Sequence, residues 1–397
     1  MATRDPRWVL KDRPSFALII GLVLTGICAL VSFSFDVLNG APVQFFIALV
    51  LALAPVPLLL AGVLALDRME PEPRSNLIFA FAWGAGIAVL AAGVVNSLNL
   101  HYIIDTARLS EASARNIAAT FGAPVVEETM KGLVLLGLLK FRRAELDGPT
   151  DGIIYASMVG LGFAMSENVS YYIAALNSEA GVKGLAVTVV LRGILSPLAH
   201  PLFSSMIGVG VAYAAQRGGS ERVFYILAGW SGAMVLHGLW NGLASYGGFP
   251  GLVVAYLALL VVLVVLMGVV FRDRRRIVAL IHRYLPPYEP TKLVTQADVY
   301  MLSAFARRRQ ARQWAKAHGG KRGLRAMRDY QLAATELGLL HERAARHMVD
   351  EQVFHEEQRA LLECMSTARA DFPVPSMHAR SVARGSPPPG YAPGAPG

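Results

Sequence analysis

The sequence predicts an all-α polytopic membrane protein with about eight transmembrane helices and a helical cytoplasmic C-terminal tail. Of its 397 residues, 54% are hydrophobic and only 16% are charged, and the mean hydropathy is +0.45. Soluble domains carry about 25% charged residues, so this composition excludes an ordinary soluble protein. The apolar residues also cluster in stretches of about 18–25 residues, each long enough to cross about 30 Å of hydrocarbon as a helix.

The predicted spans are separated by short polar loops. In chain order they are 16–35, 44–66, 77–99, 116–139, 152–176, 184–214, 223–246 and 250–271. The first span follows basic residues, as a signal peptide would, but it is longer than a typical apolar signal region and no small-x-small cleavage site follows it. We therefore expect it to be a retained membrane helix. The two cysteines, Cys28 and Cys364, fall in a span and in the polar tail, so no disulfide framework is expected.

Basic residues alternate between the loops. Four precede the first span, two follow the second, three follow the fourth, two follow the sixth, and the run RDRRR at 272–276 follows the eighth. The opposite loops carry between none and two. The positive-inside rule therefore predicts a multi-pass protein of the cell membrane with both termini in the cytoplasm. It also accounts for the net charge of +9 without a nucleic-acid partner.

Changes in composition suggest four regions along the chain. They are a cytoplasmic N-terminus at 1–15, a membrane domain at 16–271, a basic helical cytoplasmic region at 272–380 and a disordered Pro/Gly-rich tail at 381–397. We expect the basic region to bind anionic lipid or a regulatory partner. Its histidines lie on strongly charged helices and are expected on solvated faces: His341, His347 and His355.

Four spans carry strongly polar side chains where apolar ones are expected. These residues are Glu127, Glu128, Lys131, Glu167, Asn168, Arg192, His200, His237 and Asn241. A charged side chain at the bilayer centre costs about 2.5–3.5 kcal/mol on insertion scales, so such residues face a polar chamber and mark function. One residue on each span, Glu127, Glu167, His200 or His237, lies 13 to 17 residues from the predicted cytoplasmic end. At 1.5 Å per residue they share a depth of about 20–25 Å, which predicts a single site.

Spacing on the fourth span indicates how its charges are tolerated. Glu127 and Lys131 are related as i, i+4, and Glu128 and Lys131 as i, i+3, so all three share one helix face. We expect Lys131 to pair with a carboxylate as an orienting partner rather than to act as a nucleophile. Arg192 is expected to be a structural counter-charge, and Asn96 to lie at the membrane interface.

Two carboxylates and two histidines form a set that can activate water. A buried glutamate can act as a general base, and a histidine can share that role or ligate a metal. An asparagine amide and an imidazole can stabilise the oxyanion of a tetrahedral intermediate, so the set suits amide hydrolysis. A proton-coupled transporter is an alternative, although such proteins usually contain inverted repeats and the sequence shows none. A non-catalytic membrane scaffold of the same fold is the other alternative.

Four segments in this order resemble the PrsW family of intramembrane proteases, which appears related to the CAAX prenyl proteases and the abortive-infection membrane proteins. They are EETMK (127–131), DGIIYASMVGLGFAMSEN (151–168), Arg192 with His200 eight residues later, and HGLWN (237–241). LDRMEPEPR at 66–74 and FAWG at 81–84 also resemble longer members of the family. The resemblance covers about residues 15–272.

The resemblance implies an intramembrane endopeptidase that cleaves membrane-anchored proteins, with anti-sigma factors as the best-known substrates of the family. In this chain, Glu127 or Glu128 would activate the water with help from Glu167 and His200. The oxyanion donors would be His237 and Asn241. Lys131, Asn168 and Arg192 would support the site. This chain has a glutamate, Glu167, in the second motif, as PrsW-type proteins do. CAAX proteases carry histidine at that position.

The sequence leaves the cofactor, the substrate and the oligomeric state open. Glu128, Glu167, His200 and His237 could hold a divalent metal such as zinc, and a metal-free glutamate mechanism fits equally well. The expected partners are a membrane-anchored protein substrate and the lipid bilayer. Because the site lies about two-thirds of the way across from the cytoplasm, we expect cleavage in the outer half of a substrate span or just outside it.

Overall fold

The computed structural model describes residues 15–66 and 69–372, which are almost entirely helical and contain no strand. The predicted helical polytopic class is confirmed. The predicted N-terminal segment, except Ser15, and the predicted disordered tail lie outside the described residues. The chain divides into two compact units. One, the membrane unit, comprises 13–67 and 72–270; the other, the C-terminal unit, takes in 68–71 and the chain from 271 onward.

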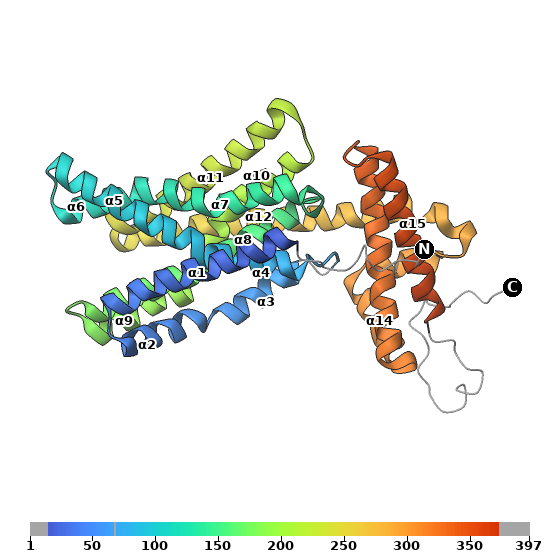
Figure 1. Ribbon diagram of the computed structural model, residues 1–397, viewed down its shortest axis with the longest axis horizontal. Coiled ribbons are helices and arrows are strands. Elements are labelled where there is room, and N and C mark those ends of the chain that lie inside the picture. The colour runs from blue at the N-terminus through green and yellow to red at the C-terminus, as the bar shows by residue number, and fades with distance from the viewer. Residues whose placement is uncertain (1–14, 67–68, 373–397) are drawn as a thin grey trace. The chain divides into compact units, whose positions relative to one another are not determined.

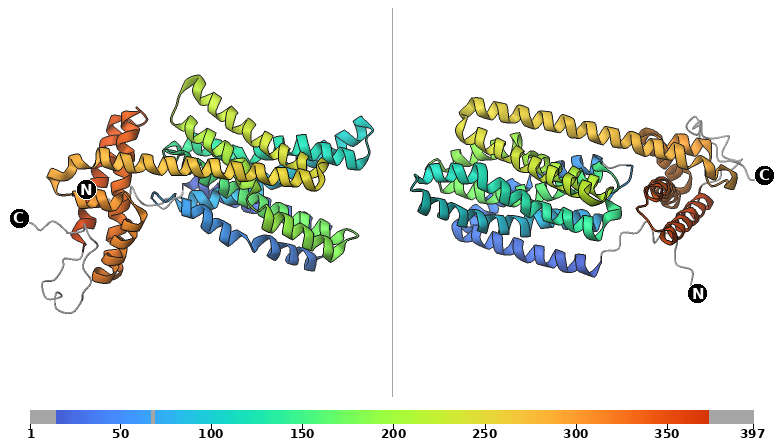
Figure 2. Two further views of the ribbon diagram at one scale, coloured as in Figure 1. Left: turned by 180° about the vertical axis from the view of Figure 1, so that it is seen from behind. Right: turned by 90° about the horizontal axis from the view of Figure 1, so that it is seen from above.

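The helices of the membrane unit have their axes roughly aligned (Figures 1 and 2). In chain order they are α1 (Phe16–Asn39), α2 (Pro42–Leu53), α3 (Val56–Leu66), α4 (Arg74–Trp83), α5 (Val89–Ala107), α6 (Glu111–Ile117), α7 (Ala123–Phe141), α8 (Pro149–Asn177), α9 (Gly181–Thr188), α10 (Ala199–Ala215), α11 (Gly219–Tyr246) and α12 (Gly248–Tyr284). A short 3₁₀ turn, Arg143–Glu145, follows α7. The boundary between the units falls within α12.

Six helical segments of the described chain are long and apolar enough to cross a membrane: Phe16–Asn39, Pro42–Leu66, Arg74–Ala107, Gly181–Ala215, Gly219–Tyr246 and Gly248–Tyr284. The protein is therefore a multi-pass membrane protein. The other two long helices of this unit, α7 and α8, carry the carboxylates of the predicted site, of which Glu127 and Glu128 are buried and Glu167 is partly exposed. The count of eight spans remains a prediction.

Helix α8 is buried on all sides from Pro149 to Ser166, and glycines let its neighbours approach it closely. Most of its 29 residues are buried. A Cβ atom added at Gly152 would lie 2.1 Å from the carbonyl oxygen of Gly208 on α10, and one at Gly162 would lie 2.0 Å from that of Phe81 on α4. Small residues at such crossings allow the backbones of membrane helices to pack against each other. Glycine is therefore required where α8 meets α10 and α4.

Three π-helical turns interrupt the long helices: Gly84–Ala88 between α4 and α5, Ala118–Gly122 before α7, and Val189–Leu195 after α9. Such turns loosen the regular backbone hydrogen bonding and are frequent at functional sites. Side chains from other helices bond two of them. Ser166 Oγ donates to the Ala85 carbonyl at 2.8 Å, and Asn241 Nδ2 donates to the Ala119 carbonyl at 2.8 Å. These turns were not predicted from the sequence.

The C-terminal unit has its own hydrophobic core. It contains the end of α12, a 3₁₀ segment (Pro286–Thr291), α13 (Gln296–Leu302), α14 (Phe305–Ala345) and α15 (Glu351–Ala370), with α15 packed along α14 (Figure 1). Met69 belongs to this core, and its carbonyl accepts a 3.0 Å hydrogen bond from the buried guanidinium of Arg308. Burial lowers the pKa of Arg308 to about 10. Met69, between α3 and α4, thus belongs to the core of the C-terminal unit.

One histidine prediction for this region was wrong. His347 and His355 are exposed as predicted, whereas His341 is half-buried. The His341 ring stacks on Tyr284 with 5.2 Å between centroids, and its Nε2 lies 2.7 Å from the Tyr288 hydroxyl. Burial lowers the pKa of His341. Its surroundings on α12 and the following 3₁₀ segment, rather than its charged sequence neighbours, decide its environment.

Candidate active site

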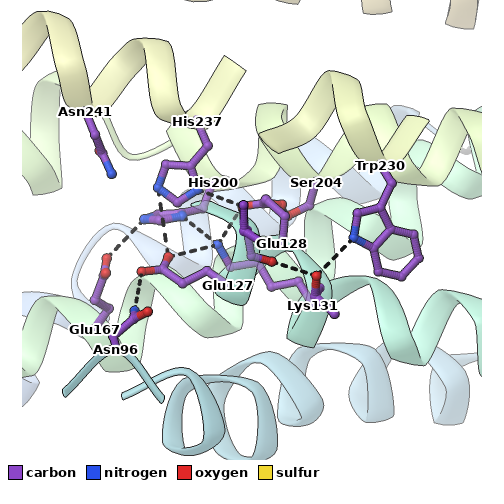
Figure 3. A network of polar contacts seen from close by, with 12 residues as sticks. Asn96, Glu127, Glu128, Lys131, Glu167, His200, Ser204, Trp230, His237 and Asn241 are labelled. Atoms are coloured by element: carbon purple, nitrogen blue, oxygen red, sulfur yellow. Dashed lines mark hydrogen bonds and ion pairs between the residues drawn. The ribbon is translucent and has the colours of Figure 1, made fainter. Parts of the chain in front are cut away.

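Polar side chains from four helices converge inside the membrane unit (Figure 3). Helix α7 supplies Glu127, Glu128 and Lys131, and Glu167 comes from α8, His200 from α10 and His237 from α11. Contacts join all six into one network. Residues up to 110 positions apart in the sequence therefore share a single polar cluster.

Lys131 lies at the centre of this cluster and is completely buried. Its Nζ atom lies 2.9 Å from Glu128 Oε1, 3.5 Å from Glu127 Oε2 and 2.9 Å from His200 Nδ1. The same ammonium lies 3.8 Å from the centroid of the Phe163 ring, within the range of a cation–π interaction. One cation thus compensates two buried carboxylates, which would otherwise be costly in an apolar surrounding.

The contacts of the two imidazoles indicate their tautomers. An ammonium group only donates hydrogen bonds, so His200 Nδ1 must accept from Lys131, and Nε2–H donates to Glu167 Oε2 at 3.0 Å. His237 Nδ1 lies 3.0 Å from Glu128 Oε1, so Nδ1 carries the ring proton and donates a hydrogen bond to that carboxylate. His237 Nε2 then has a free lone pair, 3.9 Å from Glu127 Oε2.

The two adjacent glutamates have different surroundings. Glu128 is fully buried, and its carboxylate accepts from Lys131, from His237 and, at 2.9 Å, from Ser204 Oγ. Glu127 makes longer contacts and lines a cavity of about 600 Å³ that Glu167 also lines. Of these two glutamates, Glu127 is therefore the one that reaches the cavity.

Glu167 forms an ion pair with Arg192. The guanidinium of Arg192 also donates to Asn168 Oδ1 at 2.8 Å and lies 3.8 Å from the centroid of the Tyr171 ring. These contacts agree with the expected counter-charge role of Arg192. Asn168 orients Arg192 from the adjacent position on α8, next to Glu167.

Asn241 stands apart from the cluster. Its amide donates to the Ala119 carbonyl in the π-helical turn before α7, and no dashed line joins it to the network in Figure 3. This bond ties α11 to the turn that leads into the two glutamates. The structure therefore brings together the charged residues and histidines of the predicted set, while Asn241 contacts backbone.

Three residues that contact the cluster were not predicted from the sequence to do so. Asn96, predicted to lie at the interface, donates to Glu127 Oε1 at 3.2 Å. Ser204 bonds Glu128, and Phe203 stacks on His237 with 4.6 Å between ring centroids. Ser204 and His200 are spaced i, i+4 on α10, so a shared helix face was the signal that could have identified Ser204.

The donor set can be tested for its fit to a metal ion. Glu127, His200 and His237 each offer a ligand atom, and these atoms all lie within 4.8 Å of one another. One carboxylate and two imidazoles make up a ligand set of catalytic zinc sites, and a carboxylate behind a ligating histidine, as Glu128 is behind His237, is the usual outer partner. The residues fit a divalent metal, provided that His200 gives up one of its present contacts.

Comparisons with known proteins identify the family of the chain. The family described as PrsW family intramembrane metalloprotease matches residues 72–269. Protease PrsW of Geobacillus kaustophilus is 29% identical over 192 residues, which cover 48% of this chain and 76% of that protein. Protease PrsW of Clostridioides difficile is 28% identical over 194 residues, with the same two coverages. Protease PrsW of Oceanobacillus iheyensis is 25% identical over 209 residues, covering 52% and 88%. No solved structure shows significant similarity to the chain.

The fold and the buried cluster define a multi-pass helical membrane enzyme with its polar site inside the bundle. The chain belongs to the PrsW family of intramembrane proteases, which are peptide-bond hydrolases. The resemblance inferred from the four sequence motifs is confirmed. The region that matches the family contains every residue of the cluster and leaves out α1 and α14.

Proposed function

We propose that this protease hydrolyses peptide bonds in the membrane spans of anchored proteins, with Glu127 as the general base. The observation that carries the proposal is the contrast between the two neighbouring glutamates. Glu128 is saturated with donors, whereas Glu127 lines the cavity beside the cluster. A water molecule in that cavity would transfer a proton to Glu127 as its oxygen attacks the scissile carbonyl carbon.

The remaining groups then have distinct roles. Glu128 orients His237 and holds the Lys131 ammonium in place, so the cluster keeps its geometry as charge develops. Lys131, a buried cation beside the base, favours the negative charge that forms on the carbonyl oxygen. Glu127 returns the proton that it took from water to the leaving amine as the C–N bond breaks, and the hydrogen-bonded pair of Glu167 and His200 assists beside it. Asn241 positions the backbone that precedes Glu127.

A divalent metal such as zinc would be held by Glu127, His200 and His237. The two histidines were ligand candidates from the sequence, whereas Glu127 was not. When bound, it would lower the pKa of a coordinated water and polarise the scissile carbonyl. With Glu127 engaged as a ligand, Glu167 is the other carboxylate of the cluster that lines the cavity.

The substrate class follows from the position of the site. Its residues lie deep in a bundle of apolar helices, so a peptide bond can reach them only from within or beside the membrane. With both termini in the cytoplasm, the site lies nearer the outer surface, and cleavage falls in the outer half of the substrate span or just beyond it. A membrane-anchored anti-sigma factor is such a substrate.

A comparison of protein N-termini tests the proposal. Cells expressing the native chain, Glu127→Gln, Glu128→Gln or the control Gly137→Ala would be analysed by mass spectrometry of membrane-protein N-termini. A Cβ at Gly137 meets no atom within 4 Å, so that control should behave as native. We expect new termini within or beside single-span proteins with the native and control chains only. Identical terminus profiles for the native and Glu127→Gln chains, at equal abundance, would refute the proposal.

A further inference from the structure

The cavity beside the cluster is built from four helices of the membrane unit and has a volume of about 600 Å³. Helix α1 contributes a face spaced i, i+3, i+4, i+7 (Ser32, Phe35, Asp36 and Asn39), and α5 contributes residues from Val89 to His101. Glu127 of α7 and Phe163, Glu167 and Ser170 of α8 complete the wall. Ligand sites in proteins have about this size, with mostly apolar walls and a few placed polar groups.

The described residues that line this cavity include three carboxylates, Asp36, Glu127 and Glu167, and no lysine or arginine. Glu127 and Glu167 have cationic partners from outside the lining, but no ion pair of Asp36 occurs in the described part of the chain. Asp36 is only 6% exposed. Its Oδ1 accepts a 2.7 Å hydrogen bond from Ser170 Oγ, and no described group bonds its Oδ2.

A buried carboxylate oxygen without a donor is unfavourable, so a ligand that supplies a donor there gains affinity. Asn96 shows the same pattern. Its amide nitrogen bonds Glu127 while its Oδ1, also in the described part of the chain, has no partner. Two unfilled acceptors on different walls of one cavity indicate a ligand that brings hydrogen-bond donors. A peptide with a basic side chain supplies both, through its backbone N–H groups and its cationic end.

The position of Asp36 relates it to the scissile bond. Ser170, which bonds Asp36, is three residues after Glu167 on α8, about one helical turn or 5 Å along the axis. An extended peptide advances about 3.3 Å per residue, so one turn corresponds to roughly two residues. Because a lysine or arginine side chain is long, the basic residue that reaches Asp36 can lie roughly two to four residues from the scissile bond.

We propose that this cavity binds the substrate segment next to the scissile bond and that Asp36 selects a lysine or arginine within it. This inference rests on the proposed proteolysis of membrane-anchored proteins and names a feature of the substrate. Asp36 lies outside residues 72–269, the region that matches the family. The preference therefore belongs to the α1 wall of this chain rather than to its catalytic cluster.

The first test asks whether substrate occupies the cavity. A Cβ at Gly93, which lines it, meets no atom within 4 Å, so Gly93→Phe can begin its side chain in open space and add bulk at the cavity wall. The probe is a single-span reporter with an apolar span and a lysine beside it, and the readout is intact reporter that co-purifies with the Glu127→Gln chain. Gly93→Phe in that background should abolish co-purification. Gly26→Phe, on α1 with equal open space but outside the lining, should not.

The second test asks whether Asp36 selects substrates by the charge of a residue beside the span. Reporters carrying Lys, Gln or Glu at each position near the membrane end of the span would be expressed with the native, Asp36→Asn or Asp36→Lys chain, and cleavage would be quantified from new N-termini. The native chain should prefer Lys over Glu by roughly tenfold, the order expected of one charge-assisted hydrogen bond. Asp36→Asn should reduce this ratio, and Asp36→Lys should invert it.

The outcomes separate the two proposals. Cleavage that depends on Glu127 but keeps its Lys preference in Asp36→Lys, or co-purification that survives Gly93→Phe, overturns the cavity inference and leaves the proposed catalysis intact. Cleavage that persists in Glu127→Gln while Asp36→Lys inverts the preference overturns the proposed base alone. Co-purification of all reporters regardless of charge, displaced by phosphatidylethanolamine vesicles, would assign the cavity to a lipid headgroup and also overturn the inference.

Discussion

Lys131 decides the electrostatics of the site at the scale of single residues. It is the cation shared by two carboxylates and a histidine, and all of its neighbours in this cluster are buried. Removing one member of a buried ion pair leaves an uncompensated charge, which usually costs about 3–5 kcal/mol. The stability of the bundle therefore depends on the same group that contacts both glutamates and His200.

We expect Lys131→Met to lower the free energy of unfolding by about 3–5 kcal/mol, because Glu128 would lose its ammonium partner. The measurement is the thermal unfolding midpoint of the chain purified in detergent. Lys140→Met is the matched control, since this exposed lysine at the end of the same helix should matter by about 0.5 kcal/mol or less. Adding Glu128→Gln to Lys131→Met should recover part of the loss. If the two losses simply added, the proposed pairing would be wrong.

The metal prediction also concerns single residues. If the site binds zinc, with Glu127 as a ligand in place of a free base, the purified chain should retain about one zinc per molecule after incubation with zinc and dialysis. His237→Ala should then retain none, because it removes an imidazole from the ligand set. Elemental analysis measures this without any assay of activity. His318→Ala, an exposed histidine of the C-terminal unit, should retain zinc like the native chain. Equal retention by the native and His237→Ala chains would exclude the proposed ligand set.

Contacts between single residues were largely predictable where their spacing along one helix brings the side chains together. The i, i+3 and i, i+4 relations of Lys131 to Glu128 and Glu127 follow from helix geometry alone, and the structure contains both contacts. The contact of Asn96 with Glu127 was not predictable, because it depends on how α5 crosses α7. The difference between Glu127 and Glu128 depends in the same way on what each carboxylate faces across the bundle.

At the scale of helices, close packing of α8 determines where Glu167 lies. The α8–α10 crossing brings Gly152 and Gly208 together, and a Cβ at Gly208 would lie 2.0 Å from the Gly152 carbonyl oxygen. Backbone atoms cannot move aside as a flexible side chain can. The two helices would have to separate, and His200 on α10 would move away from Glu167 on α8.

Gly208→Ala is therefore expected to destabilise the bundle by about 1–3 kcal/mol and to reduce cleavage. The unfolding midpoint in detergent and the yield of new N-termini are the two readouts. Gly137→Ala, a glycine of α7 with open space around its Cβ position, should be neutral or slightly stabilising because alanine favours helix. A Gly208→Ala chain as stable and as active as Gly137→Ala would show that the close crossing is unimportant.

The length of the apolar stretches predicted that helices would form, but it did not predict where their regular geometry is interrupted. Each predicted span coincides with helical segments of the structure, whereas the π-helical turns before α5 and α7 left no clear signal in the sequence. Their carbonyls are bonded by Ser166 and Asn241, which lie on other helices. Such turns form because tertiary contacts stabilise them, so local propensity could not reveal them.

For the whole molecule, the alternating charge of the loops predicts the orientation of the bundle. Both ends of the chain should lie in the cytoplasm, so a fluorescent protein fused after Gly397 should fluoresce and alkaline phosphatase fused there should be inactive. Fusions at Ser110, between α5 and α6, should show the reverse pattern. Active phosphatase at the C-terminus would reverse the topology and move the predicted cut to the cytoplasmic half of the substrate.

The central claim is that Glu127 activates the water that cleaves the substrate, and purified enzyme tests it most directly. The chain would be reconstituted in liposomes with a substrate identified from its new N-termini, and kcat would be compared for native, Glu127→Gln and Gly137→Ala chains. Loss of a general base lowers kcat by about 10²–10⁴-fold, so Glu127→Gln should fall by at least about a hundredfold while Gly137→Ala keeps the native rate. A folded Glu127→Gln chain that cleaves at the native kcat would contradict the account.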